Sequence, residues 1–183
     1  MTQRTAEASP RRKARIAGVF YLLVFVTGFS ALALANGKLA ANYISTACYV
    51  VVTLLFYDLF KPVDRRLSLL AAVFSLAGCA LGVLNMLHLT PFRLSPLVLF
   101  GFYCLLIGYL IFRSTFLPRI LGVLMAFGGL GWLTFFSASL TRYLSPYNMA
   151  PGILGEGLLT LWLLVKGVNE QRWNEQERDS HHA

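Results

Sequence analysis

The sequence predicts an all-α, polytopic membrane protein with six transmembrane helices, and composition, hydropathy and charge placement each support this class. Hydrophobic residues make up 57% of the 183 residues and the mean hydropathy is +0.64, which is too apolar for a soluble domain of this size. The apolar residues form six runs, each near the ~20 residues that a helix needs to cross a ~30 Å hydrocarbon layer. The runs are Ile16–Ala35, Asn42–Phe60, Leu67–Leu89, Ser95–Phe112, Ile120–Thr141 and Met149–Val168.

The Lys and Arg residues orient these helices, because nearly all of them fall in alternate gaps between the runs. Cytoplasmic loops of membrane proteins carry an excess of Lys and Arg. We therefore expect both termini to be cytoplasmic, with only Lys38, Arg93 and Arg142 on the outer side. The net charge of +8 follows from these loops and predicts contact with lipid head groups rather than with nucleic acid. The cytoplasmic set is Arg4, Arg11, Arg12, Lys13, Arg15, Lys61, Arg65, Arg66, Arg113, Arg119, Lys166, Arg172 and Arg178.

Short polar segments flank the predicted bundle. We expect residues 1–15 to form a basic, mobile cytoplasmic lead, residues 16–169 the six-helix transmembrane bundle, and residues 170–183 a polar cytoplasmic tail that continues the last helix briefly and then frays. A second interpretation of the N-terminus stays open, because basic residues followed by an apolar stretch ending at Ala35 resemble a cleavable signal peptide. The apolar stretch is longer than a typical signal core of about 7–15 residues, and the other helices keep their orientation either way.

Two patterns concern the packing of the helices. Runs two, four and six end at Lys61, Arg113 and Lys166, a spacing that would suit three tandem helix hairpins, although uniform hairpin length and basic loops would produce it too. Glycines recur four residues apart in run three and are dense in runs five and six. Because small residues let helix backbones approach closely, we expect tight packing at these glycines.

Glu156 is the most informative ionisable residue, because it lies about two turns inside the last run. A carboxyl group at that depth is costly unless it is protonated, paired or exposed to a wet cavity. Candidate partners at the same outer level are His88, Asn85, Tyr103 and Arg142, and Asn85 and His88 share a helix face by their spacing. The sequence leaves two roles open for this polar cluster: an interhelix hydrogen bond that fixes packing, or a ligand or proton site.

Other polar and aromatic residues in the runs have simpler interpretations. Asp58 lies one turn before Lys61 and is expected to pair with Lys61, Arg65 or Arg66 near the head groups. Trp132 is expected to be a packing or interfacial belt residue. The sequence contains no His-Glu-x-x-His string, Gly-x-Ser-x-Gly elbow or Cys pair, and no second carboxyl group stands at the depth of Glu156 for acid/base work. We therefore predict no metal and no cofactor, and the sequence favours a protein that is not an enzyme.

Four strings along the chain resemble a bacterial family of multi-helix membrane proteins that is catalogued as a domain of unknown function. The strings are Arg15–Leu23, Lys61–Ala72, Gly108–Gly122 and Leu154–Gly167, and the similarity covers residues 15–168. The resemblance implies the fold and a place in the bacterial cytoplasmic (inner) membrane, and it implies no activity. Glu156 falls on a Gly-Glu string of the family, whereas Asp58 stands where the family pattern is apolar or aromatic.

Three functions from different classes remain after these arguments. A binding or transport-type protein would hold a small amphiphile or a proton-coupled solute in a cavity open to the outer side and lined by the polar cluster. A non-catalytic interaction or scaffold protein would have a filled interior, a fully hydrogen-bonded Glu156 and another membrane protein as its partner. A membrane-embedded enzyme would use Glu156 as a general acid. We favour the first, because a carboxyl group and an imidazole at one depth cost more than packing alone requires.

Overall fold

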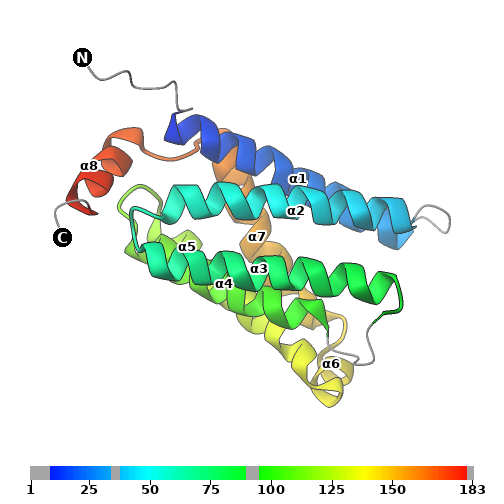
Figure 1. Ribbon diagram of the computed structural model, residues 1–183. Helices are drawn as coiled ribbons and strands as arrows, with labels where there is room; N and C mark the ends of the chain where they lie inside the picture. The colour runs from blue at the N-terminus through cyan, green and yellow to red at the C-terminus, as the bar shows by residue number, and fades with distance from the viewer. Residues whose placement is uncertain (1–8, 34–37, 90–94, 181–183) are drawn as a thin grey trace.

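The computed structural model describes residues 9–33, 38–89 and 95–180, and all regular elements within these ranges are helices (Figure 1). Six segments are long and apolar enough to cross a membrane, as predicted. They contain α1 (Pro10–Ala33), α2 (Lys38–Phe60), α3 (Arg65–Met86), α4 (Pro96–Arg113), α5 (Arg119–Leu133) and α7 (Ala150–Val165). Short 3₁₀ turns, η1 (Thr134–Phe136) and η2 (Tyr147–Met149), extend the fifth and sixth spans. The chain is thus an all-helical, multi-pass membrane protein.

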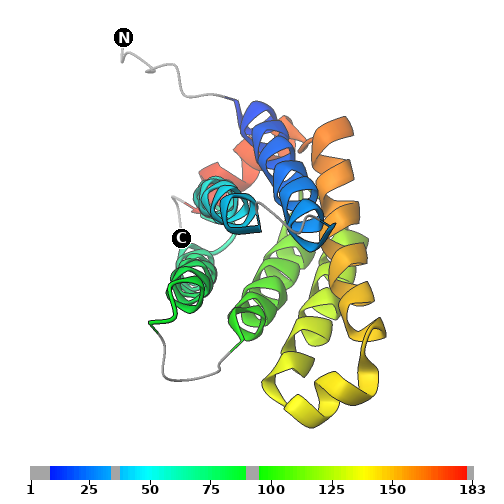
Figure 2. The same ribbon diagram turned by 90° about the vertical axis from the view of Figure 1, so that its right-hand side faces the viewer.

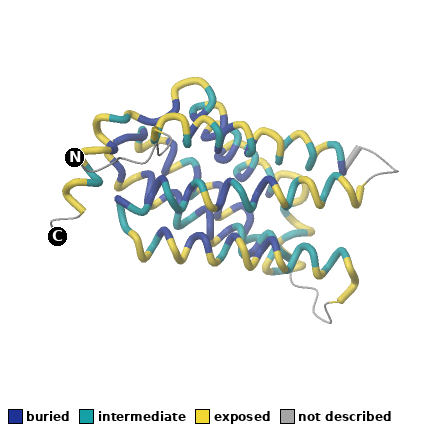
Figure 3. Tube along the Cα trace, turned by 45° about the horizontal axis from the view of Figure 1, so that its top comes forward, coloured by how far each residue is buried: buried dark blue, intermediate teal, exposed yellow. Residues whose placement is uncertain are grey.

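The six spans form a closed ring, and Figure 2 shows α2 and α3 nearly end on, with α5 and α7 seen more from the side. Each span contacts the next one along the chain, and α7 returns to contact α1. Buried residues lie toward the middle of the ring and exposed residues on the outer faces of the helices (Figure 3). Many of the exposed residues are large and apolar. An exposed apolar surface of this kind suits a lipid environment. Consecutive spans pair as antiparallel hairpins, and the tandem repeat stays a prediction.

Glycines set the closest approaches between helices, as their spacing predicts. A Cβ atom built on Gly122 of α5 would lie 2.6 Å from the carbonyl oxygen of Gly108 on α4. Another built on Gly129 would lie 2.7 Å from the carbonyl oxygen of Gly101, about two turns further along the same two helices. On α7, a Cβ atom at Gly155 would lie 2.5 Å from the carbonyl oxygen of Leu124. Since the obstacles are backbone atoms, α4, α5 and α7 can pack at this distance only with glycine at these positions.

The structure corrects three of the predicted boundaries. First, α1 begins at Pro10 and Ala14 is completely buried, so the end of the basic lead is part of the first span. Second, the fifth span ends at Phe136, and α6 (Ala138–Leu144) follows it as a separate short helix. Third, the tail does not continue the last span. The string at Ala35 that resembles a signal cleavage site lies outside the described residues.

The tail turns back because the backbone at Gly167 has φ +68°, a left-handed conformation that glycine adopts without steric cost. The chain then forms α8 (Glu170–Ser180), which lies across one end of the bundle (Figure 1). Trp173 of α8 is buried, and its Nε1 donates a hydrogen bond of 2.8 Å to the carbonyl oxygen of Leu59 near the end of α2. The polar tail is therefore a docked helix.

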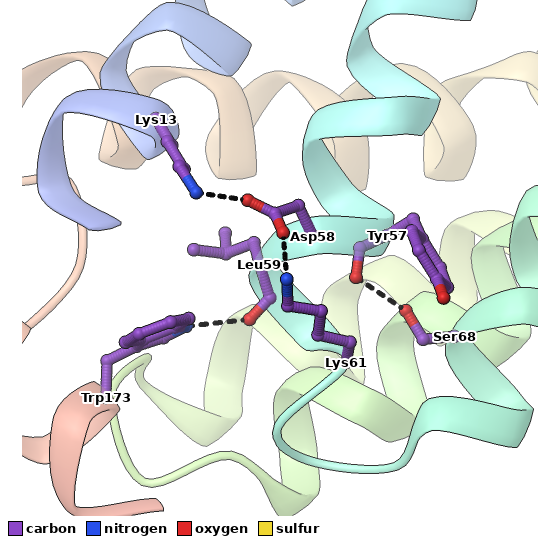
Figure 4. A network of polar contacts seen from close by, with 7 residues as sticks. All are labelled: Lys13, Tyr57, Asp58, Leu59, Lys61, Ser68 and Trp173. Carbon is purple, nitrogen blue, oxygen red and sulfur yellow. Dashed lines mark hydrogen bonds and ion pairs between the residues drawn. The ribbon is translucent and has the colours of Figure 1, made fainter. Parts of the chain in front are cut away.

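Polar contacts gather at this end of the bundle (Figure 4). Asp58 forms ion pairs with Lys61, as predicted, and also with Lys13 of α1, which the sequence did not suggest. The hydroxyl of Ser68 donates to the carbonyl oxygen of Tyr57, which joins α3 to α2. Truncating Asp58 would thus remove the carboxyl group that links Lys13 of α1 to Lys61 in the turn after α2.

The basic residues separate between the two ends of the bundle. The start of α1, the turn between α2 and α3, and α8 lie at one end, and α6 lies at the other (Figure 1). Of the Lys and Arg residues that the structure describes, only Lys38 and Arg142 belong to the end with α6. We call the end with α6 the outer end, following the charge bias. Arg93 lies outside the described residues.

Candidate functional site

Glu156 lies in the interior of the ring, where its side chain is buried. It belongs to the first half of α7, between Gly155 and Gly157. Gly155 presses the backbone of α7 against α5, so the carboxyl group is held close to the side chains of the neighbouring helices. Burying a carboxyl group in an apolar interior is costly unless hydrogen bonds satisfy its oxygen atoms.

Four side chains from four other spans donate hydrogen bonds to this carboxyl group. Tyr21 OH of α1 lies 2.6 Å from Oε2, and Trp132 Nε1 of α5 lies 2.6 Å from Oε1. Tyr49 OH of α2 lies 3.4 Å from Oε2, and Cys104 Sγ of α4 lies 3.6 Å from Oε1. Tyr21 and Tyr49 also contact each other, with 3.3 Å between their hydroxyl oxygens. We call Glu156 and these four donors the carboxyl cluster; it joins five of the six spans.

Tyr103 lies beside the carboxyl cluster without joining it. Its ring centroid is 5.9 Å from that of Tyr49, and its side chain is 1% exposed. Among the described residues, its hydroxyl is the one buried side-chain oxygen or nitrogen that has no hydrogen-bond partner. Buried hydroxyls in proteins are usually paired, so Tyr103 marks a place where the interior is polar and incompletely satisfied.

A cavity of about 330 Å³ lies between the carboxyl cluster and the outer end of the bundle. Its walls come from all six spans and are mainly apolar. Apolar lining residues include Val24, Phe25, Phe29, Leu97, Phe100 and Ile153, and polar lining residues are Ser45, Thr46, Tyr49, Trp132 and Glu156. Gly28 and Gly82 widen it, because a Cβ atom on Gly28 would meet nothing within 4 Å and one on Gly82 only Pro96, at 3.9 Å.

The other half of the interior is packed with side chains. Phe56, Phe60, Ile107, Leu110 and Leu163 are all between 0% and 1% exposed. They lie between the carboxyl cluster and the end that carries α8. The bundle is therefore asymmetric, with an open outer half and a filled inner half, and Glu156 lies at the boundary between them.

The structure brings together only part of the predicted polar cluster. Glu156 and Tyr103 lie near each other in the interior. His88 is exposed in the turn that follows α3, and its backbone has a left-handed conformation with φ 55°. Arg142 is exposed in the last turn of α6, and Asn85 is half-buried as the next-to-last residue of α3. The hydrogen bonds to Glu156 come from the four donors of the carboxyl cluster, and a ligand-binding role for His88, Asn85 and Arg142 stays a prediction.

Sequence reasoning missed Tyr21, Tyr49 and Cys104, and it interpreted Trp132 as a packing or belt residue. A signal was present for the tyrosines, because both lie well inside apolar runs, and a buried tyrosine hydroxyl or tryptophan N–H usually finds a partner. No pattern in one chain indicates that those partners converge on one carboxyl group, since helix order around the ring is not encoded in local spacing.

The fold and this interior define the chain as a polytopic membrane protein with a buried carboxyl site below an apolar cavity. The chain belongs to the DUF4386 family, a domain of unknown function, whose model matches residues 37–95 and 92–167. The matched segments contain Tyr49, Cys104, Trp132 and Glu156, whereas Tyr21 precedes them. The chain is also 31% identical over 127 residues to an uncharacterized protein of Archaeoglobus fulgidus, covering 64% of this chain and 76% of that protein. No solved structure matches the chain.

Proposed function

We propose that the protein is a binding or transport-type protein that holds a small amphiphile in the cavity above Glu156. The observation that carries the proposal is a cavity of about 330 Å³ that has apolar walls and ends on a buried carboxyl group. Ligand pockets typically enclose ~300–1,000 Å³, with mostly apolar walls and a few placed polar groups. The apolar walls suit a hydrocarbon tail and the carboxyl cluster suits a polar head.

The location of the site supports this function over a purely structural role for Glu156. A hydrogen-bonded carboxyl group that only fixed packing would not need an open space beside it, because membrane helices associate through close van der Waals packing. Here the glycines between α4 and α5 pack tightly, whereas Gly28 and Gly82 line open space. We place the protein in the cytoplasmic membrane of a bacterium, with the cavity toward the outer side.

A scaffold protein is the second candidate, and one observation favours it. Glu156 receives hydrogen bonds from four donors, which is what a structural interhelix bond requires. The cavity argues against this candidate, which predicts a filled interior. An enzyme that used Glu156 as a general acid would occupy the same cavity, and it would need a second proton-transfer group at that depth.

The test fills the cavity and leaves the rest of the ring unchanged. Gly28→Leu places a side chain in the cavity. Gly157→Leu is the matched control on α7, because Gly157 does not line the cavity and a Cβ atom there also meets nothing within 4 Å. Each protein is screened by thermal unfolding in nanodiscs against small amphiphiles with cationic, anionic and neutral heads. A ligand at about ten times its Kd should raise the Tm of the wild type by roughly 3–6 °C.

We expect Gly157→Leu to retain that shift and Gly28→Leu to lose it. If no amphiphile stabilises the wild type, the scaffold function is favoured and the search moves to partner proteins. If Gly28→Leu responds as the wild type does, the ligand binds elsewhere and the cavity is not its site.

A further inference from the structure

We propose that the cavity selects lipophilic cations whose charged head carries no N–H group, such as quaternary ammonium ions. This inference rests on the proposed amphiphile site and specifies the chemistry of its ligand. Three features carry it: aromatic rings around the cavity, a carboxyl group that has no cationic partner among the described residues, and donors that already occupy that carboxyl group.

Aromatic rings line the cavity on several helices. Phe25 and Phe29 of α1 stack with 6.3 Å between ring centroids, and Phe100 of α4 lies 4.6 Å from Tyr49 of α2. Trp132 of α5 completes this set. The faces of aromatic rings attract cations, and aromatic cages are the usual means by which proteins recognise quaternary ammonium groups. We call these five side chains the aromatic wall.

The charge in the cavity has one sign. Among the described residues that line the cavity, Glu156 has the one carboxyl group, and none is Lys, Arg or His. Asp58, with its two lysine partners, lies near the opposite end of the bundle, beyond the packed inner half. A monovalent cation in the cavity would therefore meet a complementary charge in a medium where water screens it little. An anionic or zwitterionic head would find no Lys, Arg or His for its negative group among the described residues that line the cavity.

The hydrogen bonds of Glu156 decide which kind of cation fits. An ionised carboxyl group has about four acceptor sites and donates no hydrogen bond. Tyr21 and Trp132 approach one oxygen each at 2.6 Å, and Tyr49 and Cys104 are the second donors to these oxygens. A primary ammonium ion brings three N–H donors and would have to displace one of these residues to use them. A quaternary ammonium ion has no donor to satisfy. It is attracted by the charge and by the aromatic wall while the carboxyl cluster stays intact.

The test compares four ligands that share one tail and differ in the head. Hexyltrimethylammonium, hexylammonium, hexanol and hexanoate are titrated into the full-length protein in nanodiscs by calorimetry, with empty nanodiscs as the baseline. We expect hexyltrimethylammonium to bind at least about tenfold more tightly than hexanol or hexanoate, and more tightly than hexylammonium. The expected preference follows from cation–π interactions together with the attraction of the carboxylate charge.

Three variants assign the preference to residues. Phe100→Leu removes a ring of the aromatic wall. It should weaken the binding of hexyltrimethylammonium by about three- to thirtyfold and leave the binding of hexanol nearly unchanged. Phe102→Leu, at an exposed phenylalanine of the same helix, is the matched control and should change neither. Glu156→Gln should bring hexyltrimethylammonium to the level of hexanol. If Glu156→Gln does not fold, the ligand series and the Phe100 pair still decide the question.

The outcomes separate this inference from the proposed function. Equal binding of hexyltrimethylammonium and hexanol, each lost in Gly28→Leu, would keep the amphiphile site and overturn selection of cations. If hexylammonium binds more tightly than hexyltrimethylammonium, the preferred ligand donates hydrogen bonds to Glu156. If hexanoate binds most tightly, the cavity selects anions and the inference is overturned. If none of the four ligands binds and no other amphiphile stabilises the wild type, the proposed function fails with the inference.

Discussion

Glu156 is held in the interior of the bundle by donors from α1, α2, α4 and α5. A buried carboxyl group that loses a donor keeps its desolvation cost and loses part of the compensation. The four donors are unequal, because Tyr21 and Trp132 lie at 2.6 Å whereas Tyr49 and Cys104 lie at 3.4 and 3.6 Å. The two short hydrogen bonds should therefore carry most of the stabilisation.

Two tyrosine-to-phenylalanine substitutions test this role of the carboxyl cluster with the same chemical change. Tyr21→Phe removes a short hydrogen bond to Glu156 and should lower the free energy of unfolding by about 1.5–3 kcal/mol. Tyr103→Phe removes a buried hydroxyl that has no hydrogen-bond partner, so stability should stay the same or rise by up to about 1 kcal/mol. Thermal unfolding in one detergent measures both. Equal losses in the two variants would contradict the assigned hydrogen bonds.

The sequence identified Glu156 but not its partners, and the reason is physical. An ionisable residue inside an apolar run stands out because of its cost in a membrane. Tyr21, Tyr49 and Cys104 are chemically ordinary in such runs, and their significance comes only from convergence across the ring. His88 was a reasonable candidate by depth, but α3 ends at Met86 and His88 is exposed in the turn that follows.

Helix contacts were more predictable, because glycine has a direct geometric effect. Gly122→Ala would place a Cβ atom 2.6 Å from the carbonyl oxygen of Gly108, and we expect a loss of about 1–3 kcal/mol from the forced separation of α4 and α5. Gly157→Ala meets nothing within 4 Å and should be neutral or stabilising by up to about 1 kcal/mol, since alanine favours the helix. Chemical denaturation in mixed micelles compares them. A stable Gly122→Ala protein would contradict the close approach.

The docking of α8 was not predictable from composition, because its residues are almost all polar. Trp173 is its buried residue, and Gln176 and Arg172 add exposed hydrogen bonds to Thr115. Trp173→Ala removes both a buried ring and the hydrogen bond to Leu59, so α8 should detach locally while the six spans stay folded. Limited trypsin digestion should then cut at Arg172 and Arg178 several times faster than in the wild type. Asn174→Ala, at an exposed position of the same helix, is the control. Equal cleavage rates would mean that Trp173 does not hold α8.

The whole molecule combines a closed ring, a filled inner half and a cavity toward the end with α6. The sequence predicted the number, order and approximate bounds of the spans, because hydropathy and chain length determine them. The function that the sequence favoured requires a cavity toward the outer side, but the sequence did not predict most of the residues that line it, since open space depends on how six helices with different side chains meet. The asymmetry has functional meaning only with an orientation, because the cavity opens toward the outer side in one orientation and toward the cytoplasm in the other.

Cysteine labelling of intact cells measures that orientation. Ser139→Cys lies on α6 and Ser180→Cys ends α8, at exposed positions on opposite ends of the bundle. The three native cysteines are buried and should stay unreactive toward a membrane-impermeant maleimide, so the wild type provides the blank. From the charge bias, we expect Ser139→Cys to be labelled in intact cells and Ser180→Cys only after the membrane is opened. The reverse pattern would turn the cavity toward the cytoplasm, and its ligand would then have to be sought inside the cell.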